Sequence, residues 1–270
     1  MAPISIALIV ALMVVASVVT RRPPRTEPPP SPIATSAAPA TSAAAPTVLG
    51  RTELIAAANA AAVAYAAGLA PDRGKDPLVG RAFRLRIPFG CDGPQLGTGS
   101  AQAHFELDPT NGAKTLVAQP SEWSGLPIFQ GTPDVARAES VEGFWIPRPW
   151  MILDTCPPRR DAPLPATPTP PASQTLGLAE FFAKGSARTQ RHASTPYQTV
   201  WKPKGEAPGK DAPTSFELVL EGRVDGFADG RALRCWSESA DHRPICIFAV
   251  SVSRVAFEDA AGHQIAEWRR

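Results

Sequence analysis

Apolar and polar side chains alternate in two stretches of the chain, which predicts half-buried β-strands. Residues 83–87 alternate Phe, Leu and Ile with two arginines, and residues 216–223 alternate apolar side chains with Glu and Arg. A period of two residues is the signature of a strand with one buried face. Residues 245–252 are apolar on both faces, as in a central strand.

Turn residues connect further predicted strands into hairpins. Residues 103–107 and 114–117 flank a segment that ends in Asn111-Gly112, a pair typical of hairpin turns. Residues 240–244 and 258–263 also predict turns, the second leading into a short strand over 264–268. The second half of the chain is therefore expected to form an antiparallel meander packed on one helix.

Two body helices are predicted from apolar residues at three- and four-residue steps. Thr52–Leu69 is rich in alanine, with Thr52 as the expected cap. Gln174–Arg191 places Leu178, Phe181 and Phe182 on one helical face, opposite a charged stripe, and is interpreted as the chain's amphipathic helix. The predicted fold class is mainly β (α+β), with antiparallel sheets, an N-terminal membrane helix, this Ala-rich helix and this amphipathic helix.

The unbroken apolar run Ala2–Val19 predicts a membrane segment. A helix of about 18 residues spans roughly 27 Å, close to the hydrocarbon thickness of a bilayer. No Lys or Arg precedes the run, which argues against a cleaved signal peptide, although Val14-Val15-Ala16 approximates a cleavage site. An uncleaved inner-membrane anchor with the body in the periplasm is preferred, with secretion after signal cleavage as the alternative.

Proline-rich tracts divide the chain. Among the 31 prolines, one cluster lies in the Pro/Ala-rich stretch behind the apolar run and another near the middle of the sequence. The expected divisions are a membrane anchor or signal segment (1–20), a disordered stalk (21–50), a first half with the Ala-rich helix and β-structure (51–157), a Pro-rich linker or loop (158–173) and a second half of helix and meander (174–270).

The four cysteines are interpreted as disulfides of an oxidising compartment, because they form no C-x-x-C pair. Cys235 and Cys246 flank the turn near Asp241 and come opposite each other if the flanking strands pair, so Cys91 is left to pair with Cys156. Formal net charge is +2, which does not favour nucleic acid as a partner.

Sequence motifs for chemistry are weak. The histidines His104, His192, His242 and His263 stand singly, without metal-ligand spacing. The glycines of residues 90–100 lack the lysine of a phosphate loop, and no G-x-S-x-G segment marks a nucleophile. No catalytic residue, metal or cofactor is therefore expected from the sequence.

Trp145 and Trp150 are the candidate binding surface, because two of the six tryptophans stand beside prolines in one short stretch. The first hypothesis is a membrane-tethered, exported envelope protein that acts as a non-catalytic binding or scaffold module, with an envelope protein or a glycan as its partner. The alternative is an envelope hydrolase whose site lies between the two halves, which a cleft holding His104 or His242 near a Ser or Asp would favour.

Overall fold

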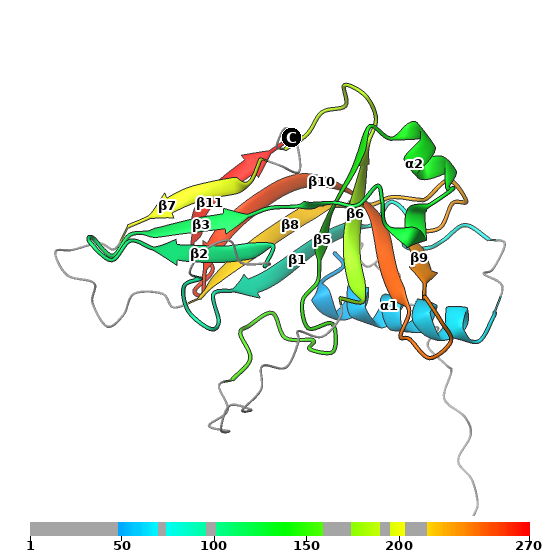
Figure 1. Ribbon diagram of the computed structural model, residues 1–270, viewed down its shortest axis with the longest axis horizontal. Coiled ribbons are helices and arrows are strands. Elements are labelled where there is room, and N and C mark those ends of the chain that lie inside the picture. The colour runs from blue at the N-terminus through cyan, green and yellow to red at the C-terminus, as the bar shows by residue number, and fades with distance from the viewer. Residues whose placement is uncertain (1–47, 70–73, 96–100, 159–173, 190–194, 203–214) are drawn as a thin grey trace, which may run out of the picture. The chain divides into compact units, whose positions relative to one another are not determined.

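The computed structural model describes residues 48–69, 74–95, 101–158, 174–189, 195–202 and 215–270 (Figure 1). Its helical elements are α1 (Arg51–Ala66), the 3₁₀ turn η1 (Pro127–Phe129) and α2 (Pro133–Arg137). Its strands are β1 (Ala82–Phe89), β2 (Ala103–Leu107), β3 (Lys114–Ala118), β4 (Ser121–Glu122), β5 (Ser140–Trp145), β6 (Leu176–Phe182), β7 (Tyr197–Trp201), β8 (Phe216–Val224), β9 (Leu233–Trp236), β10 (Ile245–Asp259) and β11 (Gln264–Arg269). The predicted mainly-β class is confirmed for the part of the chain that the structure describes.

Strand β10 organises the larger sheet. The sheet has eight strands in the order β1-β8-β10-β6-β5-β4, and β9 and β11 also pair with β10. β10 pairs in parallel with β6 and antiparallel with β8, β9 and β11, so the sheet is mixed and the prediction of purely antiparallel sheets is wrong. This long strand changes neighbours along its length: Cys246–Ala249 pairs with β6, and Val250–Asp259 pairs with β8, with a register shift between Val252 and Arg254.

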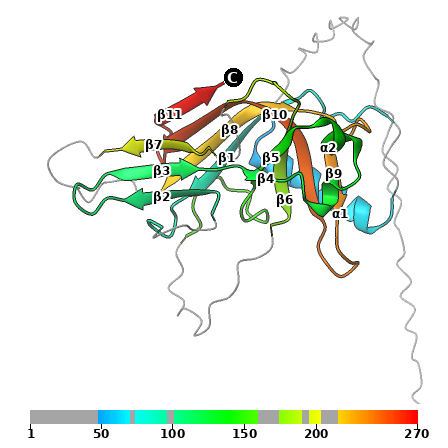
Figure 2. The same cartoon turned by 45° about the horizontal axis from the view of Figure 1, so that its top comes forward.

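The smaller sheet contains the predicted hairpin. β2 and β3 pair antiparallel around the Asn111-Gly112 turn, where Gly112 has φ +68°, and β7 adds to β3. Phe105 of β2 contacts Phe216 of β8 edge to face at 5.4 Å between ring centroids. In both views of the molecule this sheet extends away from β5 and β6 (Figures 1 and 2).

The amphipathic helix expected over residues 174–191 is wrong, because residues 176–182 form strand β6. β6 lies between β5 and β10, and both of its faces are largely buried. A short apolar run of this kind has no periodicity that separates a buried strand from a buried helix. Packing requires glycine at position 177 of this strand, because an added Cβ would lie 2.6 Å from the ring of Trp123.

Both predicted disulfides are confirmed. Cys91 bonds to Cys156 across 65 residues, and Cys235 bonds to Cys246 across 11 residues between the paired strands β9 and β10. Disulfides of this kind indicate an oxidising, extracytoplasmic compartment.

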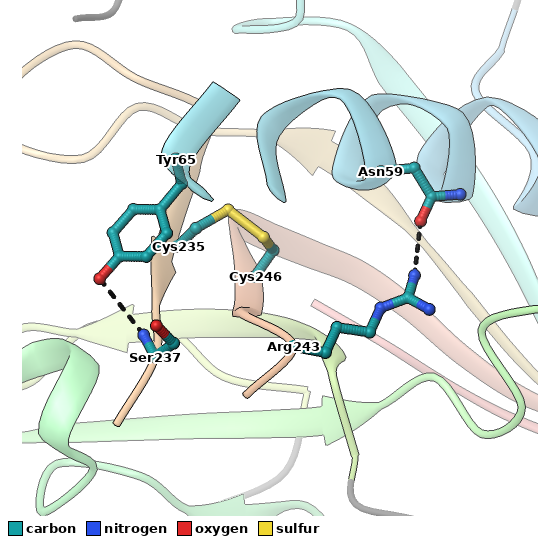
Figure 3. Close-up of a disulfide and its surroundings, with 6 residues drawn as sticks. All are labelled: Asn59, Tyr65, Cys235, Ser237, Arg243 and Cys246. Carbon is teal, nitrogen blue, oxygen red and sulfur yellow. Dashed lines mark hydrogen bonds between the residues drawn. A yellow bond between two sulfur atoms is a disulfide. The ribbon is translucent and has the colours of Figure 1, made fainter. Parts of the chain in front are cut away.

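Helix α1 confirms the Ala-rich helix and packs beside the second disulfide (Figure 3). It begins at Arg51 rather than at Thr52, with the Glu53 carboxylate accepting the amide N–H of Gly50 at 2.9 Å. Leu54, Ile55 and Ala58 are buried, whereas its last two turns are mostly exposed. The Tyr65 hydroxyl accepts the amide N–H of Ser237 at 3.3 Å, and Arg243 donates to Asn59 at 2.7 Å, so the helix is tied to the β9–β10 hairpin (Figure 3).

The two halves expected from the proline tracts share both sheets. β1 and β5 of the first half pair with β8 and β6 of the second, and β3 pairs with β7. Of the helices in the described ranges, none is both long and apolar enough to span a membrane. The run Ala2–Val19, nearly all of the expected stalk and nearly all of the expected 158–173 linker lie outside the described residues.

Candidate functional site

A hollow with a volume of about 640 Å³, here called the Trp145 pocket, lies beside the end of β1. Its walls come from the end of β1 with the loop to Gln95, from residues 101–104, and from Trp145 with Pro147 and Arg148. Gln174 and Leu218 add contributions from the second half of the chain. The pocket therefore gathers both His104 and Trp145 from the sequence-based candidates.

Trp145 is held in place by a hydrogen-bonding glutamine and by a second tryptophan. The side chain of Gln102 accepts the Trp145 amide N–H at 2.6 Å and donates to Ser121 Oγ at 2.8 Å and to the Gly143 carbonyl at 2.9 Å. The Trp123 and Trp145 rings contact at 4.5 Å between centroids. An added Cβ at Gly143 would lie 2.2 Å from the Trp123 ring, so glycine there makes room for this pair. The wall is fixed before any ligand arrives.

Two buried polar atoms of residues that line the pocket have no hydrogen-bond partner among the described residues: Gln95 Oε1 and His104 Nδ1. The other ring nitrogen of His104 lies 3.9 Å from a Glu106 carboxylate oxygen. A buried polar atom left unpaired costs about 1–3 kcal/mol, so native structures rarely keep one without a reason. Both atoms are closed off from solvent, so a ligand in the pocket would reach them only after a side-chain movement that opens them to it.

Arg51 and the Cys91–Cys156 disulfide hold the remaining wall. The Arg51 guanidinium donates to the carbonyls of Met151 at 2.8 Å, Pro147 at 2.6 Å and Arg148 at 3.1 Å. Burial lowers the pKa of Arg51, and the nearby carboxyl of Asp154 opposes that shift. Arg148, which has φ +50° and donates to Cys91 Sγ at 3.8 Å, is the one described non-glycine residue with positive φ. The buried Arg51 side chain thus fixes the backbone of residues 147–151 through three hydrogen bonds.

The expected surface of Trp145 and Trp150 is divided by the structure. Trp145 is half-buried and lines the pocket. Trp150 is 59% exposed and is not among the pocket's lining residues. The two rings therefore serve different surfaces of the body.

A second hollow of about 430 Å³ surrounds the Glu180 cluster, which consists of Glu180, Asp225, Ser251 and Arg270. Glu180 accepts hydrogen bonds from the Arg270 guanidinium and from the Val252 amide, the latter at 3.3 Å. Burial raises the pKa of Glu180 to about 7, against the opposing effect of Arg270. Burial also raises the pKa of Asp225, against a hydrogen bond from Ser251.

The other histidines lie away from both hollows or outside the described chain. His242 shares a 2.7 Å hydrogen bond with Ser239 in an exposed turn, and His263, which is 80% exposed, shares one of 3.0 Å with Asp259. His192 lies outside the described residues. No group of three metal-ligating side chains is found in the ranges that the structure describes.

Several site residues carried no usable signal in the sequence. Gln95 stands between Pro94 and Leu96, and Gln102 stands between two alanines, so nothing local shows that these side chains are partly buried. Glu180 stands in the alternating series Leu176, Leu178, Glu180, Phe182, which a strand interpretation of this segment would have marked as a buried acid.

No known family model matches this chain, and comparisons with curated proteins and with solved structures likewise find no match.

Proposed function

We propose that the chain is a membrane-tethered, exported envelope protein whose body is a non-catalytic binding module for a glycan. Support for export comes from the two disulfides, and support for the tether comes from the apolar run Ala2–Val19 followed by a proline-rich spacer. The proposed ligand site is the Trp145 pocket.

The observation that carries this proposal is the pair of unpartnered atoms, Gln95 Oε1 and His104 Nδ1, in residues that line a pocket with a fixed tryptophan. Sugars present hydroxyl groups, which both donate and accept, beside apolar ring faces. Those features match an acceptor, an imidazole and an indole within one cavity. The net charge of +2 and the mixed lining do not favour a highly charged ligand such as nucleic acid.

Binding is tested by calorimetric titration of the full chain, reconstituted in lipid nanodiscs, with a soluble tetramer of N-acetylglucosamine. We expect His104→Ala and Gln95→Ala each to weaken binding about tenfold, the equivalent of one hydrogen bond of ~1.4 kcal/mol. His263→Ala is the matched control, because this histidine is 80% exposed in a turn outside the pocket lining. Absence of binding, or an equal loss in the His263 variant, would contradict the proposal.

Hydrolysis is the second candidate, because His104 shares the pocket with Ser121 and Asp92. The hydroxyl of Ser121 accepts from Gln102, and His104 Nδ1 has no partner among the described residues, so neither forms the nucleophile–base pair of a hydrolase here. Mass spectrometry of the sugar recovered after overnight incubation separates the two functions. Intact tetramer supports binding, whereas shortened products that disappear in His104→Ala establish hydrolysis.

A further inference from the structure

Three of the most exposed large apolar side chains lie in one short loop between Pro149 and Asp154. Trp150 is 59% exposed, Ile152 is 58% exposed and Leu153 is 61% exposed. Single exposed apolar residues are ordinary on protein surfaces, but several within four consecutive positions indicate a surface that meets another apolar phase. This segment, residues 150–153, is called the apolar loop.

The apolar loop is fixed at both ends. On one side, Arg51 binds the carbonyls of Pro147, Arg148 and Met151, and the Met151 amide donates to the Arg148 carbonyl at 2.9 Å. On the other side, Cys156 is bonded to Cys91. Backbone carbonyls that are satisfied by protein donors do not need water, which is the condition for a loop to enter a lipid environment. Within the loop itself, Met151 has both its amide and its carbonyl paired with protein groups, which lowers the cost of removing water from that position.

Two charged residues, Arg148 and Asp154, flank the loop. Burial raises the pKa of Asp154, against the positive charges of Arg51 and Arg86, and the buried Oδ1 of Asp154 has no hydrogen-bond partner among the described residues. Arg148, two residues before the loop, carries a cation that suits anionic lipid headgroups. Of the two flanking charges, Arg148 is the one that favours contact with an anionic bilayer surface.

The apolar loop lies close to the point where the chain enters the body, and this favours a membrane as the apolar phase that the loop meets. The sequence that precedes Val48 holds the apolar run Ala2–Val19, and the chain enters α1 at Arg51, the residue that binds the loop. Val48 is itself 50% exposed. The spacer between run and body limits their separation to about 80 Å at ~3.1 Å per residue and sets no lower limit. Tryptophan beside aliphatic side chains is the composition found at membrane interfaces.

We propose that the apolar loop is a second membrane contact, in which Trp150, Ile152 and Leu153 enter the interface of the bilayer that holds the N-terminal segment. The inference rests on the proposed tether but not on the glycan site. A second contact would orient the body with one face toward the lipid, whereas a single tether would leave its orientation unrestricted.

The test uses the full chain reconstituted in vesicles of phosphatidylcholine and phosphatidylglycerol (3:1), with or without bromine on the acyl chains. Bromine quenches tryptophan emission only at short range. We expect brominated lipid to quench part of the emission, and Trp150→Phe to remove that quenched part. Trp236→Phe is the control, because this half-buried indole on β9 should not contribute to it. Ile152→Ser combined with Leu153→Ser should also reduce the quenching of Trp150.

Flotation of the same vesicles separates the two proposals. If the protein floats with the vesicles and Trp150→Phe leaves the quenching unchanged, the loop contact is overturned and the tether stands. If the protein does not float, the tether fails and the loop contact fails with it. A protein partner that occupies the loop would appear as flotation without quenching, together with a cross-link from a photoreactive residue placed at position 150, and would also overturn the lipid contact.

Discussion

The Trp145 pocket and the Glu180 cluster are hollows of similar size, about 640 and about 430 Å³, with opposite internal chemistry. In the Glu180 cluster the carboxylates have partners. Glu180 accepts hydrogen bonds from the Arg270 guanidinium and the Val252 amide, and Asp225 accepts one from Ser251. In the Trp145 pocket, Gln95 and His104 each keep a buried polar atom without a partner among the described residues. The carboxyl groups of the Glu180 cluster are thus paired within the cluster, although Asp134, which also lines that hollow, has a buried Oδ2 with no hydrogen-bond partner among the described residues, 3.2 Å from the Arg234 guanidinium.

The comparison shows that a perturbed pKa and an unpaired buried hydrogen-bonding atom are separate features, because each occurs here without the other. Perturbed carboxyl groups are frequent at functional sites, but ion-pair networks that only support a fold perturb pKa values as well. The cost of an unpaired buried atom is relieved by a new hydrogen bond, from a ligand or from water. Such atoms also occur outside the Trp145 pocket, in Arg51, Asp134, Asp154, Glu217 and Arg234.

Removal of the Cys91–Cys156 disulfide should have the largest effect on stability among the changes considered, and it should act on the Trp145 pocket. By the chain-entropy model, Cys91→Ala with Cys156→Ala lowers the free energy of unfolding by about 4 kcal/mol. Cys235→Ala with Cys246→Ala is the matched control, and its shorter loop of 11 residues predicts a loss of about 3 kcal/mol. Urea unfolding measures both. Only the first pair should also weaken sugar binding, and an equal effect of both pairs on binding would remove the distinction between the two regions.

Glu180→Gln should change the pH dependence of stability. The pKa of Glu180 is raised from 4.5 to about 7 in the folded state, so its contribution is fully present below about pH 4.5 and is lost as pH rises through about 7. The difference amounts to roughly 3 kcal/mol by the usual conversion of ~1.4 kcal/mol per pKa unit. Urea unfolding at pH 5 and pH 8 should show this decline in the natural chain and little of it in the variant.

Asp229→Asn, at an exposed carboxylate, is the control for that experiment. If Glu180→Gln keeps the same pH dependence as the natural chain, the cluster is not the origin of the decline. Sugar affinity should be unchanged in Glu180→Gln at either pH, because Glu180 is not among the residues that line the Trp145 pocket.

Arg51→Met should have the smallest effect on stability of the three changes, a loss of about 2 kcal/mol, because three backbone carbonyls lose a charged donor while an aliphatic side chain still fills the space. Arg137→Met, on an exposed helix face with one bond to the Pro133 carbonyl, is the control. Unfolding in urea measures the cost, and limited proteolysis should detect a new cleavage near residues 147–153 in the Arg51 variant alone. Protection equal to that of the natural chain would show that the disulfide alone holds the segment.

The strands at residues 83–87 and 216–223, the hairpin at Asn111-Gly112 and both disulfides could be predicted, because each depends on local alternation, turn chemistry or cysteine spacing. Strand β6 could not be, because its burial on both faces is decided by β5 and β10, which lie far away in sequence. The parallel pairing of β6 with β10 was missed for the same reason.

The candidate site was only partly accessible to sequence reasoning. The sequence makes Trp145 a candidate for a binding surface shared with Trp150, but the separation of the two rings depends on how Arg51 places the 147–151 segment. Gln95 and His104 become candidates only in the folded chain, where burial removes water from one polar atom of each side chain. Such properties come from tertiary packing and have no counterpart in residue order.

The late position of β10 in the sequence has a consequence for how the protein matures. β1 pairs with β8, and β6, already paired with β5, gains β10 as its second neighbour, so strands made early lack part of their pairing until much later residues emerge. At ~5–20 residues per second, β1 waits on the order of ten seconds for β8 during synthesis. Unpaired apolar strands attract one another between chains, so the nascent polypeptide needs protection over that interval. The protein should therefore depend on holding chaperones along its export route, and overproduction without them should yield aggregates formed through β1.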